Sequence, residues 1–380
     1  MASYPTTPPR TLDPAGLRAA FDAVAPLTLG IEEEAMLLDP ASLALLPRAA
    51  EVIDALDGDP RFTLELPASQ LEIVLQPVTT VGEAGDALAA ARRELARAAE
   101  GIGRLAAAGA HPLWPPTGDL NTGESRAAFA AEYGVVAGLQ TVCALQVHVA
   151  VGGHERTRAV HNALRSYLPE VAALAANAPY YAGRDTGLAS VRPEISGLLP
   201  RQGVPPAFSS WEALAGFMAW GRRGGVFPAA GEPWWEVRAH EELGTIELRV
   251  PDSQVSAEAA AGVLALGAGL VAWLAERYDA GEPLRVHDTI RIAENRWRAL
   301  RHGLAGSLLD LDTGEPEPAR ARVLALIDRV GPAAERLGGA AELEHARALA
   351  ARNGAEAQRA LAEERGPHGV VAWLADAFMP

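Results

Sequence analysis

The chain has 380 residues, of which 49% are hydrophobic and 21% charged, a composition typical of a globular protein rather than a disordered one. Its formal net charge of −15 argues against a nucleic-acid partner, which requires a basic face. The sequence contains no lysine. This excludes the P-loop lysine, Schiff-base chemistry and the Ser-x-x-Lys hydrolases. If the protein handles ATP, it must do so with arginine and metal ions.

Features that report on the compartment point to the cytoplasm. A single cysteine, Cys143, excludes an internal disulfide and a paired-thiol metal site, and it fits a reducing compartment. The first residues, Met1 to Gly16, contain no apolar segment of the signal-peptide type. The uncharged run Ala259–Ala275 is short and rich in alanine and glycine, so we expect a buried core helix and no membrane span.

The first half of the chain begins with an extended run at Leu27–Leu38, in which three consecutive glutamates stand between apolar flanks. Apolar periodicity, glycine and proline then define the following elements. In chain order we expect a helix, two short strands, a long alanine- and arginine-rich helix, a strand, a helix and a long loop, at residues 43–56, 62–66, 71–76, 81–108, 142–151, 154–176 and 179–206.

The second half continues with two strands around Gly244, at 233–239 and 245–250, and with helices at 256–278 and 288–301. Short charged helices follow from about Asp310. Strands with hairpin-like spacing, separated by helices, favour an α+β fold with an antiparallel sheet over a doubly wound parallel sheet. We expect a catalytic α+β domain over residues 1–305 and a helical C-terminal region over 306–380 packed on it. The apolar surface of these last helices is compatible with a homo-oligomer.

Four carboxylates lie within the predicted strands near the N-terminus. Residues two apart on a strand share a face, so Glu32 and Glu34 project together while Glu33 points away. Glu65 and Glu72 each interrupt an apolar strand. Taken singly, each is more typical of an outward-facing, solvated residue. Four on three short strands are harder to explain that way, and carboxylate oxygens are the ligands that Mg²⁺ prefers.

Later strands carry a second group of polar residues. His148 shares a face with Gln146, although a lone strand histidine is more often a hydrogen-bonded core residue than a metal ligand. Glu247 and Arg249 repeat the two-residue spacing with opposite charges. This pattern fits a simple ion pair, and it equally fits a metal-binding carboxylate beside a phosphate-binding arginine. Three further arginines suit bidentate capture of phosphate or carboxylate, and spacing alone does not separate them from surface residues: Arg184, Arg192 and Arg238.

Seven segments taken in order resemble the type-2 glutamate–cysteine ligase, or carboxylate–amine ligase, family. The resemblance extends from about Thr28 to the C-terminal helices, where Ala355–Arg359 also fits. The segments are GIEEE at 30–34, residues 64–73, QVHV at 146–149, PYYAGRDTGLASVR at 179–192, residues 235–238, TIELRVPD at 245–252 and ENRWRALRHG at 294–303. Any one of them alone would be weak.

That family is similar in fold to the catalytic domain of glutamine synthetase. The resemblance therefore implies a curved antiparallel sheet with an ATP site at one end and divalent metal ions, Mg²⁺ or Mn²⁺, along its floor. By position, one metal ion would be held by Glu34, Glu65 and Glu72. A second would be held by Glu32, His148 and Glu247. Arg249 would approach the ATP phosphates, and phosphate or substrate carboxylate would be bound by Arg184, Arg192 and Arg238.

The chain departs from the family pattern at three places. Members commonly show His-Val-His where this sequence has Gln146-Val147-His148, so we take His148 as the ligand and Gln146 as a supporting or substrate contact. Glu236 stands where an aspartate often precedes Val-Arg. The segment after Arg192 also diverges. These departures leave the identity of the amine substrate open.

The resemblance implies a γ-glutamyl-type ligase. It would join L-glutamate to L-cysteine at the expense of ATP through an acyl phosphate, with small molecules as its partners and neither nucleic acid nor membrane. Two alternatives remain open: the same chemistry on another acid and amine, and a non-catalytic nucleotide-binding homologue. A metal-dependent hydrolase could use the same acids but would not need the arginines beside them.

Overall fold

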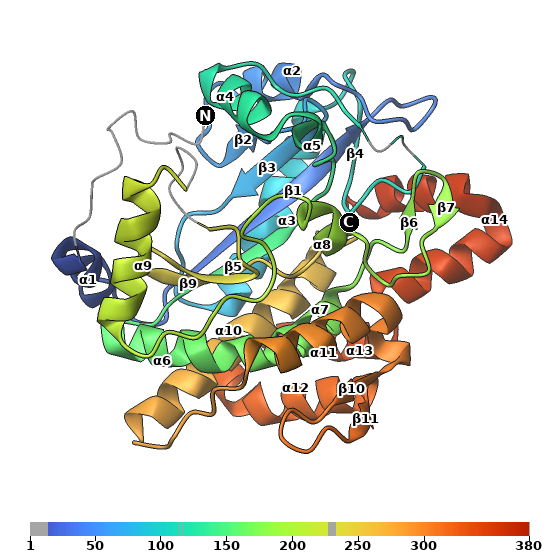
Figure 1. Ribbon diagram of the computed structural model, residues 1–380. Helices are drawn as coiled ribbons and strands as arrows, with labels where there is room; N and C mark the ends of the chain where they lie inside the picture. Colours follow the sequence, from blue (N-terminus) through green and yellow to red (C-terminus); the bar gives the residue numbers. More distant parts are fainter. Residues whose placement is uncertain (1–13, 114, 116, 227–232, 380) are drawn as a thin grey trace.

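The computed structural model describes residues 14–113, 115, 117–226 and 233–379, so most of the segment Met1 to Gly16 lies outside the described residues. At its centre is a seven-stranded sheet with the strand order β2-β3-β1-β5-β9-β8, in which β4 also pairs with β1 (Figure 1). The strands are β1 Leu29–Leu38, β2 Phe62–Leu64, β3 Gln70–Val74, β4 Arg104–Ala106, β5 Leu145–Ala150, β8 Val237–His240 and β9 Thr245–Leu248. Every one of these pairings is antiparallel, which confirms the predicted α+β class.

Two small antiparallel sheets stand apart from the main one. One pairs β6 (Tyr180–Tyr181) with β7 (Arg184–Asp185), and the other pairs β10 (Ser307–Leu309) with β11 (Pro316–Pro318). The helices are α1 Pro14–Asp22, α2 Ala49–Asp54, α3 Val81–Ala98, α4 Glu124–Tyr133, α5 Val135–Gly138, α6 His154–Leu164, α7 Leu168–Ala175, α8 Arg192–Ser196, α9 Trp211–Arg223, α10 Ala257–Asp279, α11 Thr289–His302, α12 Ala319–Arg336, α13 Ala340–Ala351 and α14 Gly354–Ala377, with 3-10 turns at Arg165–Tyr167 and Gly303–Ala305.

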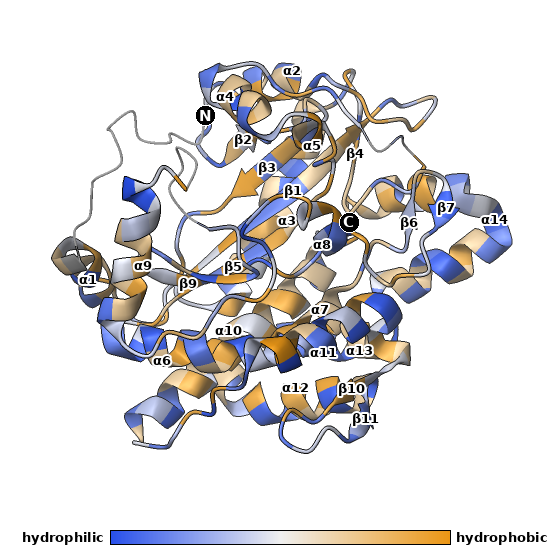
Figure 2. Ribbon diagram, in the orientation of Figure 1, coloured by the Kyte–Doolittle hydropathy of each residue, from blue (hydrophilic) through white to orange (hydrophobic). Residues whose placement is uncertain are grey.

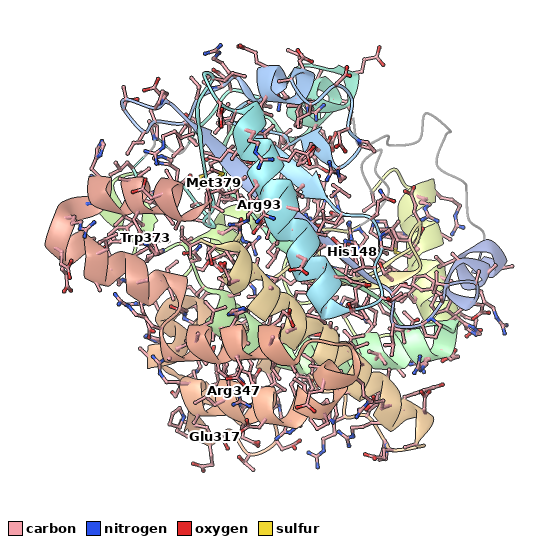
Figure 3. The ribbon with its side chains drawn as sticks, turned by 180° about the vertical axis from the view of Figure 1, so that it is seen from behind. Arg93, His148, Glu317, Arg347, Trp373 and Met379 are labelled. Carbon is pink, nitrogen blue, oxygen red and sulfur yellow. The ribbon has the colours of Figure 1, made fainter. Side chains whose placement is uncertain are left out.

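Helices α3 and α10 cover one face of the main sheet, as the view from behind shows (Figure 3). Alternate strand residues supply the apolar side of this contact: Ile31, Ile73, Val147 and Leu248 are all buried in one continuous core. Helix α10 is long and apolar enough to cross a membrane by length and composition, yet 89% of its apolar window is buried inside the protein. The predicted core helix is therefore confirmed, and Figure 2 shows many residues of α10 in hydrophobic colours.

The C-terminal helices pack on this same core. Helices α12 and α13 contact α10, and Val323 and Ile327 of α12 belong to the core cluster that includes the sheet. Helix α14 closes a second cluster, in which Val370 and Leu374 meet Met36 of β1. Residues 306–379 thus lie against the sheet-bearing part of the chain rather than apart from it.

Two predicted helices are shorter than expected. The helix expected at 43–56 is wrong before Ala49, because Leu43 has a φ of +57° and Leu45 bridges to Leu38 of β1. The helix expected at 81–108 ends at Ala98. Gly101 then adopts a φ of +79°, a conformation open to glycine, and turns the chain into β4.

The predicted loop and tail also contain more structure than expected. The loop at 179–206 includes the β6–β7 hairpin and helix α8. In the tail, α12 has 18 residues and the β10–β11 hairpin precedes it, so the expectation of short helices alone is wrong there. Helix α14 is divided into two shorter helices by a kink at Gly366, whose φ is +67°. The prediction failed there because charged, alanine-rich sequence hides the apolar face that packs on α10.

Candidate active site

One face of the main sheet, opposite α3 and α10, gathers polar side chains from neighbouring strands. Glu32 of β1 stands opposite Gln146 of β5, and His148 of β5 stands opposite Glu247 of β9. Glu247 in turn stands opposite Arg238 of β8. Because cross-strand partners project to the same face, the register alone brings these five residues together.

Three glutamates form what we call the carboxylate cluster: Glu34, Glu65 and Glu72. Glu34 and Glu72 are register partners on β1 and β3, and Glu65 follows β2. Each offers a carboxylate oxygen, and these oxygens all lie within 4.8 Å of one another. The amide of Ala144 donates to Glu34 Oε2 at 2.7 Å, and the amide of Leu66 donates to Glu65 Oε2 at 3.0 Å.

The carboxylate cluster holds more negative charge than its surroundings balance. Burial, reinforced by the charge of Glu65, raises the pKa of Glu34 to about 8. Burial and the neighbouring carboxylates also raise the pKa of Glu72 well above its usual range. Three acidic side chains that repel one another in a half-buried position suit a hard divalent cation such as Mg²⁺, which takes oxygen ligands. The residues present therefore fit the metal ion that the sequence predicts.

A second group, which we call the histidine cluster, consists of Glu32, His148 and Glu247. Thr245 Oγ1 lies 3.0 Å from His148 Nδ1 and fixes the orientation of the ring. The other ring nitrogen, Nε2, is buried and makes no hydrogen bond within the described part of the chain; it lies 3.4 Å from Glu32 Oε1 and 3.9 Å from Glu247 Oε1. A buried nitrogen that faces two carboxylates in this way fits a metal ligand.

Arginines balance the charge of the histidine cluster. Arg238 and Arg249 both donate to the fully buried carboxylate of Glu247. Burial alone would raise the pKa of Glu247, but the two guanidinium groups outweigh it and hold this pKa well below the usual range. Arg249 also donates to Gln146 Oε1, while Gln146 Nε2 donates to Glu34 Oε1 at 3.2 Å. One amide thus connects the two clusters.

The two remaining predicted arginines lie elsewhere. Arg192 is buried, and its guanidinium is held by Asp252 Oδ1 at 2.8 Å and by the carbonyl oxygens of Val250 and Arg249 at 2.6 and 3.1 Å. It therefore fixes the backbone beneath Arg249 instead of presenting a free guanidinium. Arg184 is exposed on β7, in the small sheet that is separate from the main one. The structure gathers the other eight predicted residues on one sheet face.

A buried ion pair behind the site was missed from the sequence. Glu33, which points away from its two neighbours, meets Arg92 of α3, and both side chains are fully buried. Arg92 also donates to the carbonyl of Gln254 and lies 4.8 Å over the ring of Phe378. The available signal was the position of Arg92 on the apolar face of α3, between Leu88 and Leu95 at helical spacing.

Comparison with known proteins gives a consistent result. The model of glutamate–cysteine ligase family 2 matches residues 28–372. A protein of Rubrobacter xylanophilus, provisionally named glutamate–cysteine ligase 2-3, is 42% identical over 369 residues, which cover 95% of this chain and 99% of that protein. The glutamate–cysteine ligase of Natronomonas pharaonis is 34% identical over 361 residues, which cover 92% and 95%.

Two solved structures share the fold. The glutamate–cysteine ligase of Francisella tularensis, in complex with AMP, has a TM-score of 0.66 at 12% identity and covers 94% of this chain and 90% of its own. A bifunctional glutathione synthetase of Pasteurella multocida has a TM-score of 0.63 at 14% identity and covers 96% of this chain and 53% of its own. At such identities the likeness concerns the fold.

Proposed function

Because this chain belongs to glutamate–cysteine ligase family 2, we propose that it is an ATP- and Mg²⁺-dependent carboxylate–amine ligase that forms γ-glutamylcysteine from L-glutamate and L-cysteine. The observation that carries the proposal is the carboxylate cluster beside Arg249. A set of acids that calls for a cation lies next to a guanidinium of the kind that binds phosphate.

The reaction must first bring two anions together, the substrate carboxylate and the γ-phosphate of ATP. In this proposal Glu34, Glu65 and Glu72 would hold one Mg²⁺, and Glu32, His148 and Glu247 would hold another, with Mn²⁺ as a substitute. Ions held there would supply the charge that neutralises the phosphates and would orient the transfer. Arg249 stabilises the charge that develops on the γ-phosphate, and Arg238 keeps Glu247 ionised.

The second half-reaction requires the acyl phosphate to survive until the amine attacks, so water must be kept away. The segment that follows Arg192 lies next to the site, and the contacts of Arg192 with Asp252 and two carbonyl oxygens anchor it there. Attack of the amine on the acyl carbon then forms the amide bond, breaks the bond between that carbon and the phosphate oxygen, and releases phosphate and the amine's proton. Arg184 is exposed, so its proposed contact with phosphate or substrate would require ligand on that side of the hairpin.

We place this activity in the cytoplasm. The proposal is supported by the one buried free cysteine, Cys143. The predicted substrates are small molecules, and a homo-oligomer stays a prediction.

The test is ADP release by the purified protein with ATP and Mg²⁺ across a panel of acids and amines. We expect release only with glutamate, or with glutamate plus cysteine, and loss of release in Glu34→Ala and His148→Ala. Glu317→Ala is the matched control, because Glu317 is an exposed carboxylate on β11, outside the main sheet (Figure 3). Release with a different pair would keep the ligase chemistry and reject these substrates. ATP turnover that persists in both site variants would reject the site.

A further inference from the structure

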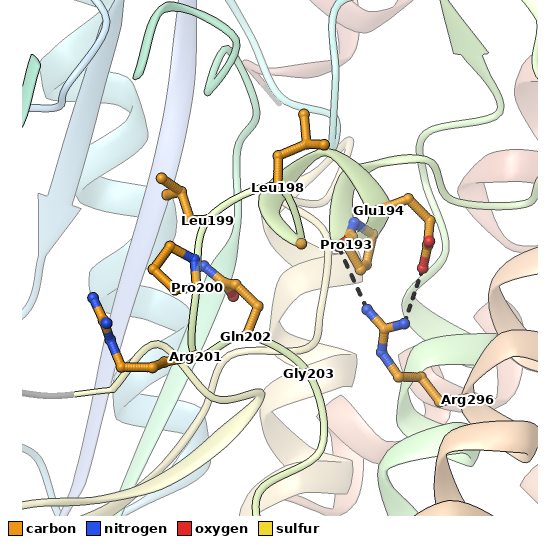
Figure 4. Close-up of a pocket in the computed structure, with 10 residues that line it drawn as sticks. Pro193, Glu194, Leu198, Leu199, Pro200, Arg201, Gln202, Gly203 and Arg296 are labelled. Atoms are coloured by element: carbon orange, nitrogen blue, oxygen red, sulfur yellow. Dashed lines mark hydrogen bonds and ion pairs between the residues drawn. The ribbon is translucent and has the colours of Figure 1, made fainter. Parts of the chain in front are cut away.

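A pocket of about 580 Å³ lies between helix α8, the turn that follows it and helix α11 (Figure 4). None of its lining residues belongs to the carboxylate or histidine cluster. It is lined by Pro193, Glu194, Gly197, Leu198, Leu199, Pro200, Arg201, Gln202, Gly203 and Arg296. Its volume is sufficient for a small metabolite.

The backbone connects this pocket to the site. At one end of the lining segment, Arg192 bonds to the carbonyl of Arg249. At the other end, the carbonyl of Gly203 accepts from the amide of Glu236 at 3.0 Å, and the carbonyl of Glu236 accepts from the amide of Arg249 at 2.8 Å. Hydrogen-bonded neighbouring strands lie about 4.8 Å apart, so the backbones of Gly203 and Arg249 are separated by about 10 Å. An amino-acid substrate can span most of that distance.

Two arginines line the pocket, and they differ in how their charge is balanced. Arg296 is paired with the carboxylates of Glu236 and Glu194, the latter at 2.9 Å. Arg201 has neutral partners: its Nη2 donates to the hydroxyl of Tyr133 at 2.9 Å, and its guanidinium lies 5.7 Å from the ring centre of Trp234. Its Nε is buried and has no hydrogen-bond partner among the residues that the structure describes.

The backbone of Arg201 is strained as well. Its φ of +63° is unfavourable for any residue with a side chain. Helix α4 and Trp234 support the guanidinium, because Phe129, Tyr133 and Trp234 form a ring cluster with centroid distances of 4.6 to 5.8 Å. An arginine held in a strained conformation over an aromatic platform, with neutral partners, is prepared for an anion.

We propose that this pocket binds the α-amino-acid head group of a substrate, with the non-reacting carboxylate of that substrate on Arg201. The assignment rests on the proposed ligase function and gives its site a substrate anchor. Both proposed substrates, L-glutamate and L-cysteine, carry this α-amino-acid head group. Glutamate would direct its γ-carboxylate toward Arg249, and cysteine would direct its amine there.

The test compares each amino acid with the analogue that lacks only its α-carboxylate. The pairs are L-glutamate with 4-aminobutyrate and L-cysteine with cysteamine. The variants are Arg201→Gly, which removes the guanidinium and relieves the positive φ, and Arg201→Lys, which keeps the charge. Arg298→Gln is the control, because Arg298 is a partly exposed arginine on α11 paired with Glu294. Calorimetric titration without ATP and steady-state KM values are both measured.

We expect Arg201→Gly to weaken binding of one amino acid by about 10- to 100-fold, as for a lost charged hydrogen bond, and to leave the KM for ATP unchanged. Its decarboxylated analogue should bind wild type and variant alike, and Arg201→Lys should recover part of the affinity. The amino acid whose binding weakens in Arg201→Gly, while binding of its decarboxylated analogue stays the same, is the substrate that occupies the pocket. Equal weakening of the amino acid and its analogue, or no change for either pair, overturns the assignment.

The titrations separate this proposal from the proposed function. If wild type releases ADP with glutamate and cysteine while Arg201→Gly keeps both KM values, the pocket assignment fails and the ligase function stands. If no pair yields ADP but amino-acid binding depends on Arg201, the pocket assignment stands and the ligase function fails.

Discussion

The carboxylate cluster and the histidine cluster share a sheet face but differ in how their charge is balanced. In the histidine cluster, the carboxylates of Glu32 and Glu247 are matched by two guanidinium groups, and the pKa of Glu247 is lowered. In the carboxylate cluster, arginines act on the three acids only at longer range, Arg249 on all of them, Arg192 on Glu34 and Arg126 on Glu65, and the pKa values of all three acids are raised. A cation is therefore needed most at the carboxylate cluster, which we expect to be the tighter metal site.

The largest expected effect tests this ranking. Glu34→Ala removes the proposed ligand that borders both Glu65 and Glu72, so we expect Mn²⁺ affinity at the carboxylate cluster to fall by more than about 100-fold, since even outer partners of metal ligands account for 10- to 100-fold. Glu32→Ala should leave that site intact. Titration of Mn²⁺ followed by paramagnetic resonance measures both. A tight site that survives in Glu34→Ala but disappears in Glu32→Ala would reverse the ranking.

The next largest effect concerns the histidine cluster and its arginines. Arg249→Gln leaves the buried carboxylate of Glu247 with Arg238 alone, and breaking a buried ion pair costs about 3 kcal/mol or more. We expect that loss in the free energy of unfolding, measured by urea denaturation without metal. Arg336→Gln, which removes an exposed pair with Glu276, should change the free energy of unfolding far less, because water screens the two charges. Equal costs for the two variants would contradict the assignment of Arg249 to a buried network.

The pH dependence of stability distinguishes the clusters by sign. Folded Glu34 keeps its proton up to a pKa of about 8, whereas the unfolded chain releases it near the usual 4.5, so the folded metal-free protein binds more protons between these values. Its free energy of unfolding should therefore fall as pH rises from 5 to 8, by up to about 1.4 kcal/mol per pH unit for one proton.

Glu34→Gln should flatten this decline, and saturating Mg²⁺ should abolish it because the ion replaces the proton. Glu247 works in the opposite direction: its lowered pKa stabilises the protein above pH 4.5 and loses this effect as pH falls below that value. Thermal unfolding across pH, with and without Mg²⁺, measures both contributions. If the free energy of unfolding fell with pH at the same slope in wild type and in Glu34→Gln, Glu34 would be excluded as the origin of the decline.

The smallest expected effect concerns the residue that joins the clusters. Gln146→Leu removes the hydrogen bonds to Glu34 and Arg249 while keeping the volume, so we expect about a 10-fold loss in metal affinity with little change in the melting temperature. Gln146→His should recover part of the affinity, since a neutral imidazole offers one donor and one acceptor. A loss of stability as large as that of Arg249→Gln would instead make Gln146 a purely structural residue.

The strand pattern predicted much of this site, because a period of two fixes which residues share a face. Glu32 and Glu34 do project together, and Glu33 points to the other side. The helix prediction failed beyond Ala98 because the sequence there keeps a helical composition, while the pairing of β4 with β1 is a tertiary contact. Arg192 could not be interpreted from its loop, since its partner Asp252 lies 60 residues further along the chain.

The buried pair of Glu33 and Arg92 has a consequence for how the protein is made. The pair joins β1 to α3, and Arg92 also contacts the carbonyl of Gln254 and the ring of Phe378. During synthesis, the guanidinium that pairs with Glu33, behind Glu32 and Glu34, therefore gains this aromatic neighbour only after residue 378 has left the ribosome. Until then, a buried guanidinium lacks its aromatic cover, so we expect nascent chains to form the proposed metal sites late rather than strand by strand.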